Sequence, residues 1–297
     1  MPRARYHLLD VFTDRPFAGN PLAVVVDPPE LSAAQMQTIA RELNLSETVF
    51  VHSPGDATAA WPTRIFTPGA ELPFAGHPTI GTAVLLAHLG RVSERVVLAE
   101  PVGDVAVTLE ARLGGWSATL RTAMAPTFAE APDRDVLARA LGLDAADLHR
   151  DLAAGVWSCG VPFGVVPLRD AAALARTRVE PAVWAEHLEH TDAAQLFPIA
   201  PLDDELHRWR ARMFAPGFGI AEDPATGSAA AAAAGLLAAS RQLRAGPMQW
   251  VIEQGVEMGR PSELRVALDH DGAEASGVLV GGDAVVVGDG EMEVPPA

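Results

Sequence analysis

Two stretches of this chain repeat one pattern, and this internal duplication limits the possible folds more than any other feature. Both copies open with Arg-x-Phe-x-Pro, at 64–68 and 212–216, and close with Pro-x-x-Gly-(Thr/Ser)-Ala, at 78–83 and 224–229. The offsets are 212 − 64 = 148 and 224 − 78 = 146. A third match, Gly-x-Pro-x-x-Val-Val at 19–25 and 160–166, has an offset of 160 − 19 = 141. Matches in the same order at similar offsets indicate two halves built on one plan.

Each copy predicts a strand, a loop and then a helix rich in Ala and Leu. Pro78 and Pro224 suit the first turn of a helix, where a missing N–H costs little. The glycine and hydroxyl residues beside them let backbone donors at a helix start approach an anion. His77 and Asp223 directly precede the two prolines, and their offset is 223 − 77 = 146. We therefore expect equivalent roles for these two residues; the alternative is that each only caps its own helix.

The remaining chain predicts many short strands and a few helices. Strands are expected near 5–12, 22–26, 45–51, 61–67, 94–100, 104–110, 116–121, 155–159, 163–168 and 207–214. From residue 248 onward the chain predicts only short strands joined by Gly-rich turns, with the strands in the segments 248–262, 263–269, 275–282 and 283–294. Helices are expected at 32–44, 133–142, 144–150, 170–176 and 181–189, with 122–127 connecting the halves. A curled, mostly antiparallel sheet around one apolar helix is the economical packing for each half. We expect an α+β fold with the ligand in the cleft between two pseudo-symmetric domains.

Composition excludes several classes of function. The net charge of −16 makes nucleic acid and anionic membranes poor partners. All 22 basic residues are arginine, which excludes a Schiff-base lysine and a Walker lysine. Cys159 is the single cysteine, so no internal disulfide forms, and its apolar setting predicts a buried structural thiol. The N-terminus lacks a signal peptide and no apolar run is long enough to span a bilayer, which predicts a cytoplasmic protein.

Some polar residues have an ordinary explanation when taken from composition alone. Glu47 lies where a helix ends and a strand begins, a place that favours cations and indicates a solvated loop carboxylate. Arg208, Arg210 and Arg212 alternate along one predicted strand and suggest a solvated sheet face. The His-Leu-Glu-His run at 187–190 has no third ligand nearby, so we expect no metal there.

The chain resembles the PhzF-like family of phenazine biosynthesis, whose fold is that of diaminopimelate epimerase. The resemblance rests on DVFTDRPFAGNPLAVV, LNLSETVF, FTPGAELPFAGHPTIG, MFAPGFGIAEDPATGSA and QGVEMGRPS, which span nearly the whole chain in the family's order. It implies that Glu47 is the catalytic base, that His77 and Asp223 line the same cavity, and that the substrate's acid group is bound by Ser46, Gly76, Gly227 and Ser228. It also implies a first half of residues 1–122 plus about 284–297, a second half of 123–283, and a homodimer.

The resemblance further implies a cofactor-independent and metal-free isomerase acting on a small carboxylic acid. The best-known substrate of the family is trans-2,3-dihydro-3-hydroxyanthranilate, in which a proton moves between carbons as the double bonds shift. A buried carboxylate with a raised pKa suits this proton transfer. Epimerases of this fold use two cysteines, which this chain cannot supply. Two alternatives stay open: an epimerase or racemase using Glu47 and Asp223, and a binding protein without turnover.

Overall fold

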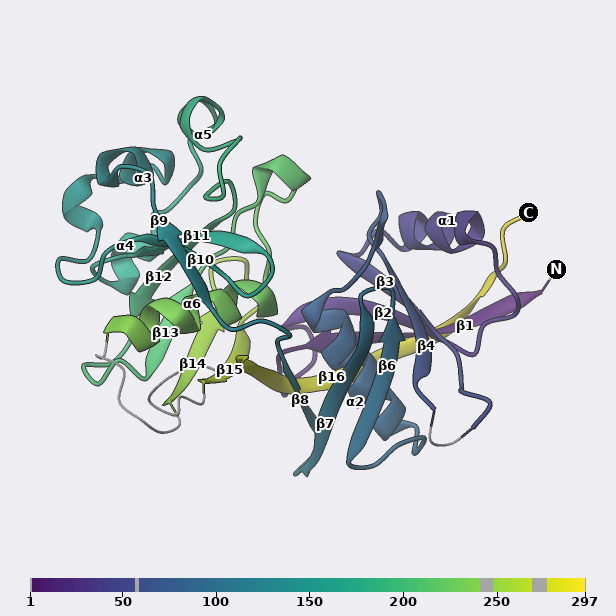
Figure 1. Ribbon diagram of the computed structural model, residues 1–297. Coiled ribbons are helices and arrows are strands. Elements are labelled where there is room, and N and C mark those ends of the chain that lie inside the picture. Colours follow the sequence, from purple (N-terminus) through teal and green to yellow (C-terminus); the bar gives the residue numbers. More distant parts are fainter. Residues whose placement is uncertain (1, 57–58, 241–247, 269–276, 297) are drawn as a thin grey trace. The chain divides into compact units, whose positions relative to one another are not determined.

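The computed structural model describes residues 2–56, 59–240, 248–268 and 277–296. The chain divides into two compact units, Met1–Leu120 with Gly281–Ala297, and Arg121–Val280 (Figure 1). The division into epimerase-like halves at 1–122 with about 284–297 and at 123–283 stays a prediction.

The first unit is a closed barrel of strands. Its strands are β1 (Arg3–Val11), β2 (Asn20–Val26), β3 (Glu47–Val51), β4 (Trp61–Phe66), β5 (Glu71–Leu72), β6 (Arg95–Glu100), β7 (Gly103–Arg112), β8 (Gly115–Arg121) and β16 (Leu279–Glu293). The strand order is β1-β2-β3-β4-β6-β7-β8-β16, and β16 also pairs antiparallel with β1, which closes the sheet. The pairs β2–β3 and β4–β6 are parallel. The last strand of the chain therefore completes the barrel that the first strand begins.

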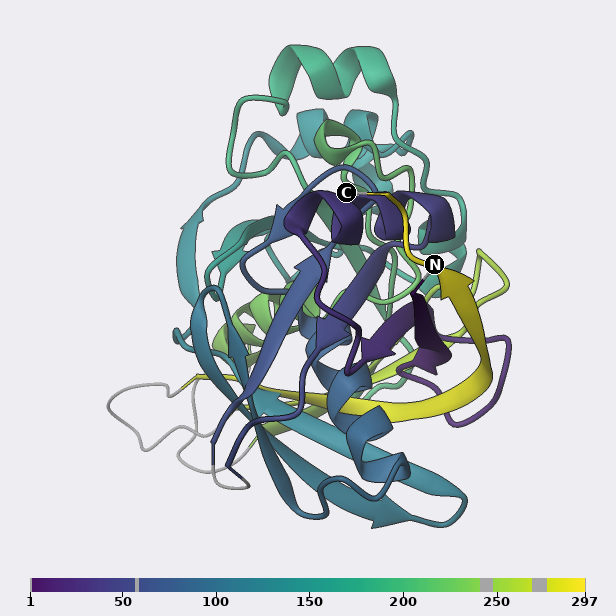
Figure 2. The same ribbon diagram turned by 90° about the vertical axis from the view of Figure 1, so that its right-hand side faces the viewer.

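Helix α2 (Gly76–His88) fills this barrel. Every residue from His77 to Ala87 is buried, which matches a helix that is apolar on all sides and enclosed by its neighbours. It contacts β1, β2, β3 and β7, and Figure 2 shows it in blue with strands of the unit around it. Gly81 allows the closest approach, because a Cβ atom there would lie 2.5 Å from Leu22 Cδ2 and 2.7 Å from Val11 Cγ2.

Helix α1 (Ala33–Leu43) covers the outside of the barrel at β3 and β4. The helix begins with a capping box: Ser32 accepts from the backbone N–H of Gln35, and the Gln35 side chain accepts from the backbone of Ser32. Met36, Ile39 and Ala40 form its buried face. The helix ends at Asn44, whose left-handed backbone turns the chain directly into β3.

Among the described residues, the strands of the second unit follow the order β15-β14-β13-β12-β11-β10-β9. These strands are β9 (Thr127–Glu130), β10 (Gly155–Ser158), β11 (Pro162–Pro167), β12 (Leu196–Pro201), β13 (Arg208–Ala211), β14 (Met248–Gln254) and β15 (Ser262–Leu268). The helices are α3 (Arg134–Ala140), α4 (Ala171–Ala175), α5 (Pro181–His187) and α6 (Gly227–Ser240), with 3-10 turns at Ala145–Asp147 and Pro216–Phe218. Strands β9 and β12 were not predicted from the sequence.

Helix α6 is the second unit's counterpart of α2. Its residues from Ala229 to Ala238 are buried, and it contacts β9, β10 and β11 as well as β14 and β15 near the other end of the sheet order. The sheet therefore curls around the helix, as expected for each half. Alanine permits this enclosure because it leaves room for neighbours on every side; at Gly235 even a Cβ atom would lie 2.3 Å from the Trp157 ring.

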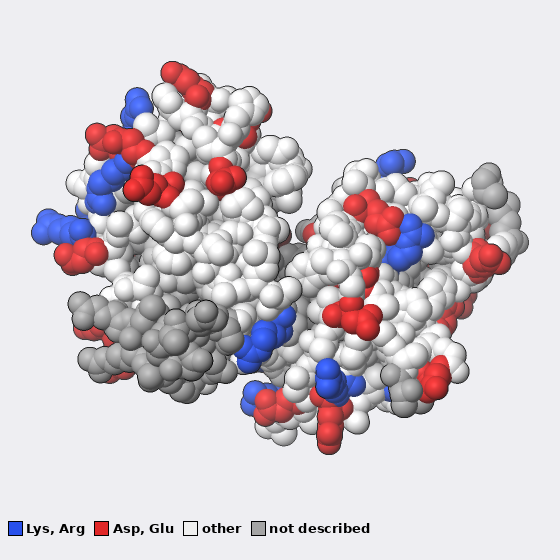
Figure 3. Space-filling model, viewed as in Figure 1, with Lys and Arg blue, Asp and Glu red and all other residues white. Residues whose placement is uncertain are grey.

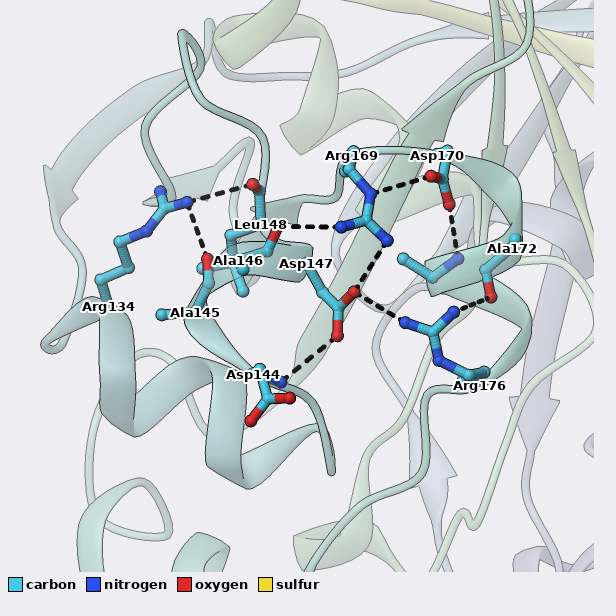
Figure 4. Close-up of polar contacts among 11 residues, drawn as sticks. Arg134, Asp144, Ala145, Ala146, Asp147, Leu148, Arg169, Asp170, Ala172 and Arg176 are labelled. Carbon is cyan, nitrogen blue, oxygen red and sulfur yellow. Dashed lines mark hydrogen bonds and ion pairs between the residues drawn. The ribbon is translucent and has the colours of Figure 1, made fainter.

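Ionic contacts join α4 to the short turn at Ala145–Asp147. The Asp147 carboxylate accepts from Arg176 at 2.7 Å and from Arg169 at 3.0 Å, while its other oxygen accepts from the backbone of Asp144 at 3.3 Å (Figure 4). Hydrogen bonds from these groups keep the pKa of Asp147 below its usual value despite its desolvation. The predicted helix at 144–150 is wrong, because the chain forms only a 3-10 turn there.

Three further expectations are corrected. The predicted turn at Gly281–Gly282 is absent, and the strands expected at 275–282 and 283–294 form one strand, Leu279–Glu293; residues 275 and 276 lie outside the described residues. Gly281 allows close packing, since a Cβ there would lie 2.4 Å from Thr119 Oγ1. Pro224 lies before α6 and not in its first turn. Cys159 is only half-buried, just after β10, and burial is the main reason its thiol pKa rises to about 11.

Of the three arginines predicted on a solvated sheet face, Arg208 of β13 is exposed and Arg210 of β13 is half-buried. Arg208 and Arg210 both donate to Glu253 of β14, at 2.8 and 3.1 Å. Arg212 is buried. On the face shown in Figure 3, basic side chains lie singly or in small groups, commonly beside acidic ones. Among the described residues, no helix is long and apolar enough to cross a membrane.

Candidate active site

Two elements of the first unit bring Glu47 and Asn20 to one edge of the barrel. Glu47 is the first residue of β3 and Asn20 the first residue of β2. The two strands run parallel, with Leu22 opposite Glu47, so both strands begin at the same edge. Asn20 follows Gly19, whose positive φ of 66° and close contact with the Val11 carbonyl leave no room for a side chain. The left-handed end of α1 at Asn44 delivers Ser46 and Glu47 to the same edge.

His77 joins this group from the first turn of α2. Its Nε2 atom lies 3.2 Å from Glu47 Oε2, and the two side chains are only 7% and 16% exposed. His77 and Gly81 are four residues apart and therefore share one helix face. The close packing of Gly81 on Leu22 and Val11 thus presses the face that carries His77 against β2. The 3.2 Å approach is not an aligned hydrogen bond; catalytic contacts of this kind commonly tighten when substrate binds.

The imidazole of His77 is neutral at physiological pH. Burial disfavours its charged form and lowers its pKa to about 3. Asn20 Nδ2 lies 3.5 Å from His77 Nδ1, and Ser46 Oγ donates to Asn20 Oδ1 at 3.5 Å. An amide NH₂ group can only donate, so Nδ1 is the acceptor and the ring proton is on Nε2, next to Glu47. Ser46, Asn20, His77 and Glu47 form one polar chain, which we call the Glu47 cluster.

The buried carboxyl group of Glu100, at the end of β6, contacts α2 at Thr79, two residues beyond His77. Thr79 Oγ1 is 2.7 Å from Glu100 Oε1 and 2.8 Å from the carbonyl oxygen of Ala75. Because one hydroxyl proton cannot serve two acceptors, a protonated Glu100 is the form that satisfies both contacts. Burial raises the pKa of Glu100 to about 7. The contact thus ties the end of β6 to the first turn of α2, which carries His77.

Asp223 lies in the second unit, in the loop that leads to α6. Its carboxylate accepts from the hydroxyl of Thr226, and its backbone N–H donates to the Met213 carbonyl at 3.1 Å. Gln254, which is fully buried at the end of β14, donates to the Asp223 carbonyl at 2.7 Å. The same amide accepts from the Thr226 N–H at 3.1 Å. Asp223 therefore belongs to a loop held by Thr226, just before α6, and by Gln254 of β14.

Of the predicted binding residues, Ser46 lies just before β3, and Gly76, Gly227 and Ser228 lie at the two helix starts. Gly76 opens α2, and Ala75 before it has no side chain that could cap the first turn. Gly227 opens α6 and is buried, with the half-buried Ser228 next to it. In the alignment of the two copies, α6 starts opposite Gly81, since 227 − 146 = 81. His77 thus lies inside a helix, while Asp223 precedes one, and their equivalence is one of chain position only.

Sequence reasoning missed Asn20, Thr226, Gln254 and Ser262. Asn20 lies in the segment DVFTDRPFAGNPLAVV, which carries part of the family resemblance. Ser262 donates to the carbonyl of Pro224 at 2.8 Å, and Gly255, with φ of 74°, packs against that same carbonyl. These contacts explain the segment QGVEMGRPS: it supports the Asp223 loop. Among the described residues, no three His, Cys, Asp or Glu side chains are grouped so as to bind a metal.

Comparison with known proteins agrees with this architecture. The family model described as "Phenazine biosynthesis-like protein" matches residues 9–290. A trans-2,3-dihydro-3-hydroxyanthranilate isomerase of Pseudomonas chlororaphis is 40% identical over 97% of this chain and 98% of that protein. The solved PhzF-family protein of Bacillus anthracis is 28% identical, with a TM-score of 0.90 over 99% of this chain and 100% of that one.

A more distant structure shares only the fold. The hydroxyproline epimerase of Agrobacterium vitis is 12% identical, with a TM-score of 0.59 over 97% of this chain and 92% of that one. The barrel of the first unit and the curled sheet of the second, each around a helix, are thus those of the diaminopimelate epimerase-like fold, as the resemblance predicted. With a family match over nearly its whole length and isomerases among its relatives, the chain belongs to the phenazine biosynthesis-like protein family and is an isomerase.

Proposed function

We propose that this isomerase moves a proton within a small carboxylic acid, with Glu47 as the general base and no metal or organic cofactor. The observation that carries the proposal is the 3.2 Å approach of the Glu47 carboxylate to a buried, neutral His77. A carboxylate with restricted solvent exposure is a suitable base for a carbon acid. The named activity of the P. chlororaphis relative makes a cyclic amino acid such as trans-2,3-dihydro-3-hydroxyanthranilate the first substrate to test.

In this mechanism Glu47 removes a proton from one carbon of the conjugated system, and the electron pair of that C–H bond shifts the double bonds. The same proton, carried by the Glu47 carboxyl group, then returns to a carbon farther along the system. The Nε2–H group of neutral His77 stabilises the Glu47 carboxylate before the first step and after the last. Asn20 and Ser46 hold the tautomer of His77 that makes this possible.

We further propose that the acid group of the substrate binds where both helices start, between the two halves of the chain. Support comes from the internal duplication and from the donors that a helix start offers to an anion. Gly76 would contribute backbone donors from α2; Gly227 and Ser228 would contribute backbone and hydroxyl donors from α6. Asp223 would move a second proton or hold the amino group of the substrate.

Solvent exchange tests the reaction. The protein is incubated in D₂O with trans-2,3-dihydro-3-hydroxyanthranilate, and ¹H NMR follows the loss of substrate and the position of deuterium. Isomerisation supports the proposal, and ¹H at the new carbon shows that Glu47 returns the proton that it removed. An epimerase using Glu47 and Asp223 would give deuterium at the original carbon and an inverted centre. Binding detected by calorimetry without conversion would contradict an enzymatic role for this substrate.

We also propose that the protein is a cytoplasmic homodimer, as its family resemblance suggests. Sedimentation velocity at micromolar concentration is expected to show a single species of about twice the chain mass of 31.2 kDa. A monomer throughout that concentration range would contradict the proposal.

A further inference from the structure

The Arg-x-Phe motif that opens each copy of the duplication builds the same side-chain arrangement twice. Arg64 donates to both oxygens of Glu71, each at 2.7 Å, and its guanidinium lies 5.1 Å from the centre of the Phe66 ring. Arg212 donates to both oxygens of Glu222, at 2.8 and 2.7 Å, and lies 4.9 Å from the centre of the Phe214 ring. Two parallel charge-assisted hydrogen bonds are a strong and directional contact. We call the two arrangements the Arg64 clamp and the Arg212 clamp.

The two clamps differ in burial and in what else they bind. The side chains of the Arg64 clamp are 37% and 33% exposed, and those of the Arg212 clamp are 11% and 15% exposed. Arg212 Nη1 also donates to the Thr177 carbonyl at 2.6 Å and to the Thr177 hydroxyl at 3.0 Å, just after α4. A buried guanidinium that loses its carboxylate is costly, so Glu222 is strongly held in place. The Arg64 clamp has too much solvent contact to be held as firmly.

The Arg212 clamp is directly adjacent to Asp223 in the chain. The Arg64 clamp is not adjacent to His77. Glu222 directly precedes Asp223, whereas Glu71 precedes His77 by six residues. Arg212 and Glu222 pair through their side chains, and the next residues, Met213 and Asp223, pair through their backbones. These two neighbouring contacts close the loop 212–223. Asp223 is therefore fixed by Glu222 on one side and by the Gln254 contact on the other.

We propose that Arg212 and Glu222 are positioning residues, which set the place of the Asp223 carboxylate for catalysis by clamping its loop to the end of α4. The inference rests on the proposed function of Asp223. The Arg64 clamp is built from the same motif but has a local structural role only. A shift of about 1 Å in a catalytic group can cost on the order of 10²-fold in rate.

The matched pair Glu222→Gln and Glu71→Gln tests the proposal, since each removes one carboxylate charge without changing side-chain volume. Turnover of trans-2,3-dihydro-3-hydroxyanthranilate is measured over a range of concentrations and pH. Glu222→Gln is expected to lower kcat at least tenfold with KM changed less than about threefold, and to alter the pH profile. Glu71→Gln is expected to stay within about twofold of wild type. Equal effects of the two substitutions would overturn the proposal.

A double-mutant cycle separates positioning from a loss of folding. If Glu222 acts through Asp223, then Glu222→Gln added to Asp223→Asn lowers kcat no further, although the melting temperature still falls. An additive loss of kcat would show that Glu222 acts elsewhere. An Asp223→Asn variant with full activity would overturn the clamp's role, while Glu47 is tested by its own substitution.

One readout does not depend on turnover. With ¹³C-labelled aspartate, the Asp223 carboxyl resonance is assigned as the signal missing from Asp223→Asn. We expect its shift and titration midpoint to change in Glu222→Gln and to stay as in wild type in Glu71→Gln. An unchanged Asp223 signal in Glu222→Gln overturns the positioning proposal, whether or not the wild-type protein converts the tested substrate. Failure of the wild-type protein to convert that substrate counts against the proposed function alone.

Discussion

Glu47 and His77 meet because a helix end and a helix start converge on one edge of the first barrel. The left-handed residue Asn44 ends α1 and leads into β3, and α2 approaches β2 closely through Gly81. The result is a carboxylate beside an uncharged imidazole. A neutral His77 places no positive charge beside the Glu47 carboxylate.

The first prediction concerns Glu47 alone. Glu47→Gln keeps the size of the side chain and removes the base, so turnover should fall on the order of 10²–10⁴-fold. The free energy of unfolding, measured by urea titration, should change little, because the partner His77 is neutral. Retention of more than about a tenth of the wild-type rate would show that Glu47 is not the base.

Glu100 gives a prediction about stability and pH. Its pKa is about 7 in the folded protein against a usual value of 4.5. Between these two pH values the unfolded carboxyl is ionised while the folded one keeps its proton, so stability falls as pH rises. Above pH 7 this cost reaches about 3 kcal/mol. The neutral variant Glu100→Gln avoids it.

We therefore expect Glu100→Gln to match wild type near pH 4.5 and to be more stable by up to about 3 kcal/mol at pH 8. Urea unfolding of both proteins across this range is the measurement. The lowered pKa of His77 has the opposite effect below pH 6.5, but it is common to both proteins and cancels in the difference. A difference that does not grow with pH would contradict a neutral Glu100.

At the scale of elements, the two enclosed helices show why close packing decides the fold. The sequence predicts α6 from its alanines, but it does not show that Gly235 lies against Trp157 and Pro126. A Cβ atom at Gly235 would lie 2.3 Å from Trp157 Cε3 and 2.7 Å from Pro126 Cβ. Overpacking of this kind exceeds the gain of about 1 kcal/mol that alanine normally brings to a helix.

Gly235→Ala should accordingly destabilise the protein by about 1–3 kcal/mol, and thermal or urea unfolding measures this. Gly69→Ala serves as the control, since the nearest atom to its Cβ would be 3.9 Å away; it should change stability by less than about 0.5 kcal/mol. Adding Trp157→Leu to Gly235→Ala should recover part of the loss. Stabilisation by Gly235→Ala alone would mean that α6 shifts freely within its sheet.

Local signals made much of the fold predictable. The capping box at Ser32 and Gln35 and the turn residues around Asn20 act over a few positions, so the sequence displays them directly. The contact between Glu47 and His77 depends on the packing of Gly81 against Val11 and Leu22, which joins segments far apart in the chain. The same holds for Gly281, which resembles a turn residue in the sequence but packs against Thr119 inside a long strand. Residues of this kind reveal their role only once the tertiary structure is known.

For the whole molecule, the duplication carries the last prediction. Two observations indicate a common origin of the halves. His77 and Asp223 share the sequence offset of the duplication, and the Arg64 and Arg212 clamps repeat the same contacts in both halves. Two halves of common origin that pack about a pseudo-two-fold axis bring equivalent chain positions together near that axis. We therefore predict that His77 and Asp223 line one substrate cavity, with the acid group of the ligand held between the starts of α2 and α6.

A crystal structure with bound product is the measurement. We expect both side chains to contact the ligand, His77 from the Glu47 cluster and Asp223 from the loop that the Arg212 clamp closes. A separation above about 12 Å between the His77 ring and the Asp223 carboxylate, without a common pocket, would rule this out, since one small ligand in an ordinary pocket cannot bridge it. Asp223 would then be a cap for α6 through Thr226, and the proton chemistry would belong to the Glu47 cluster alone.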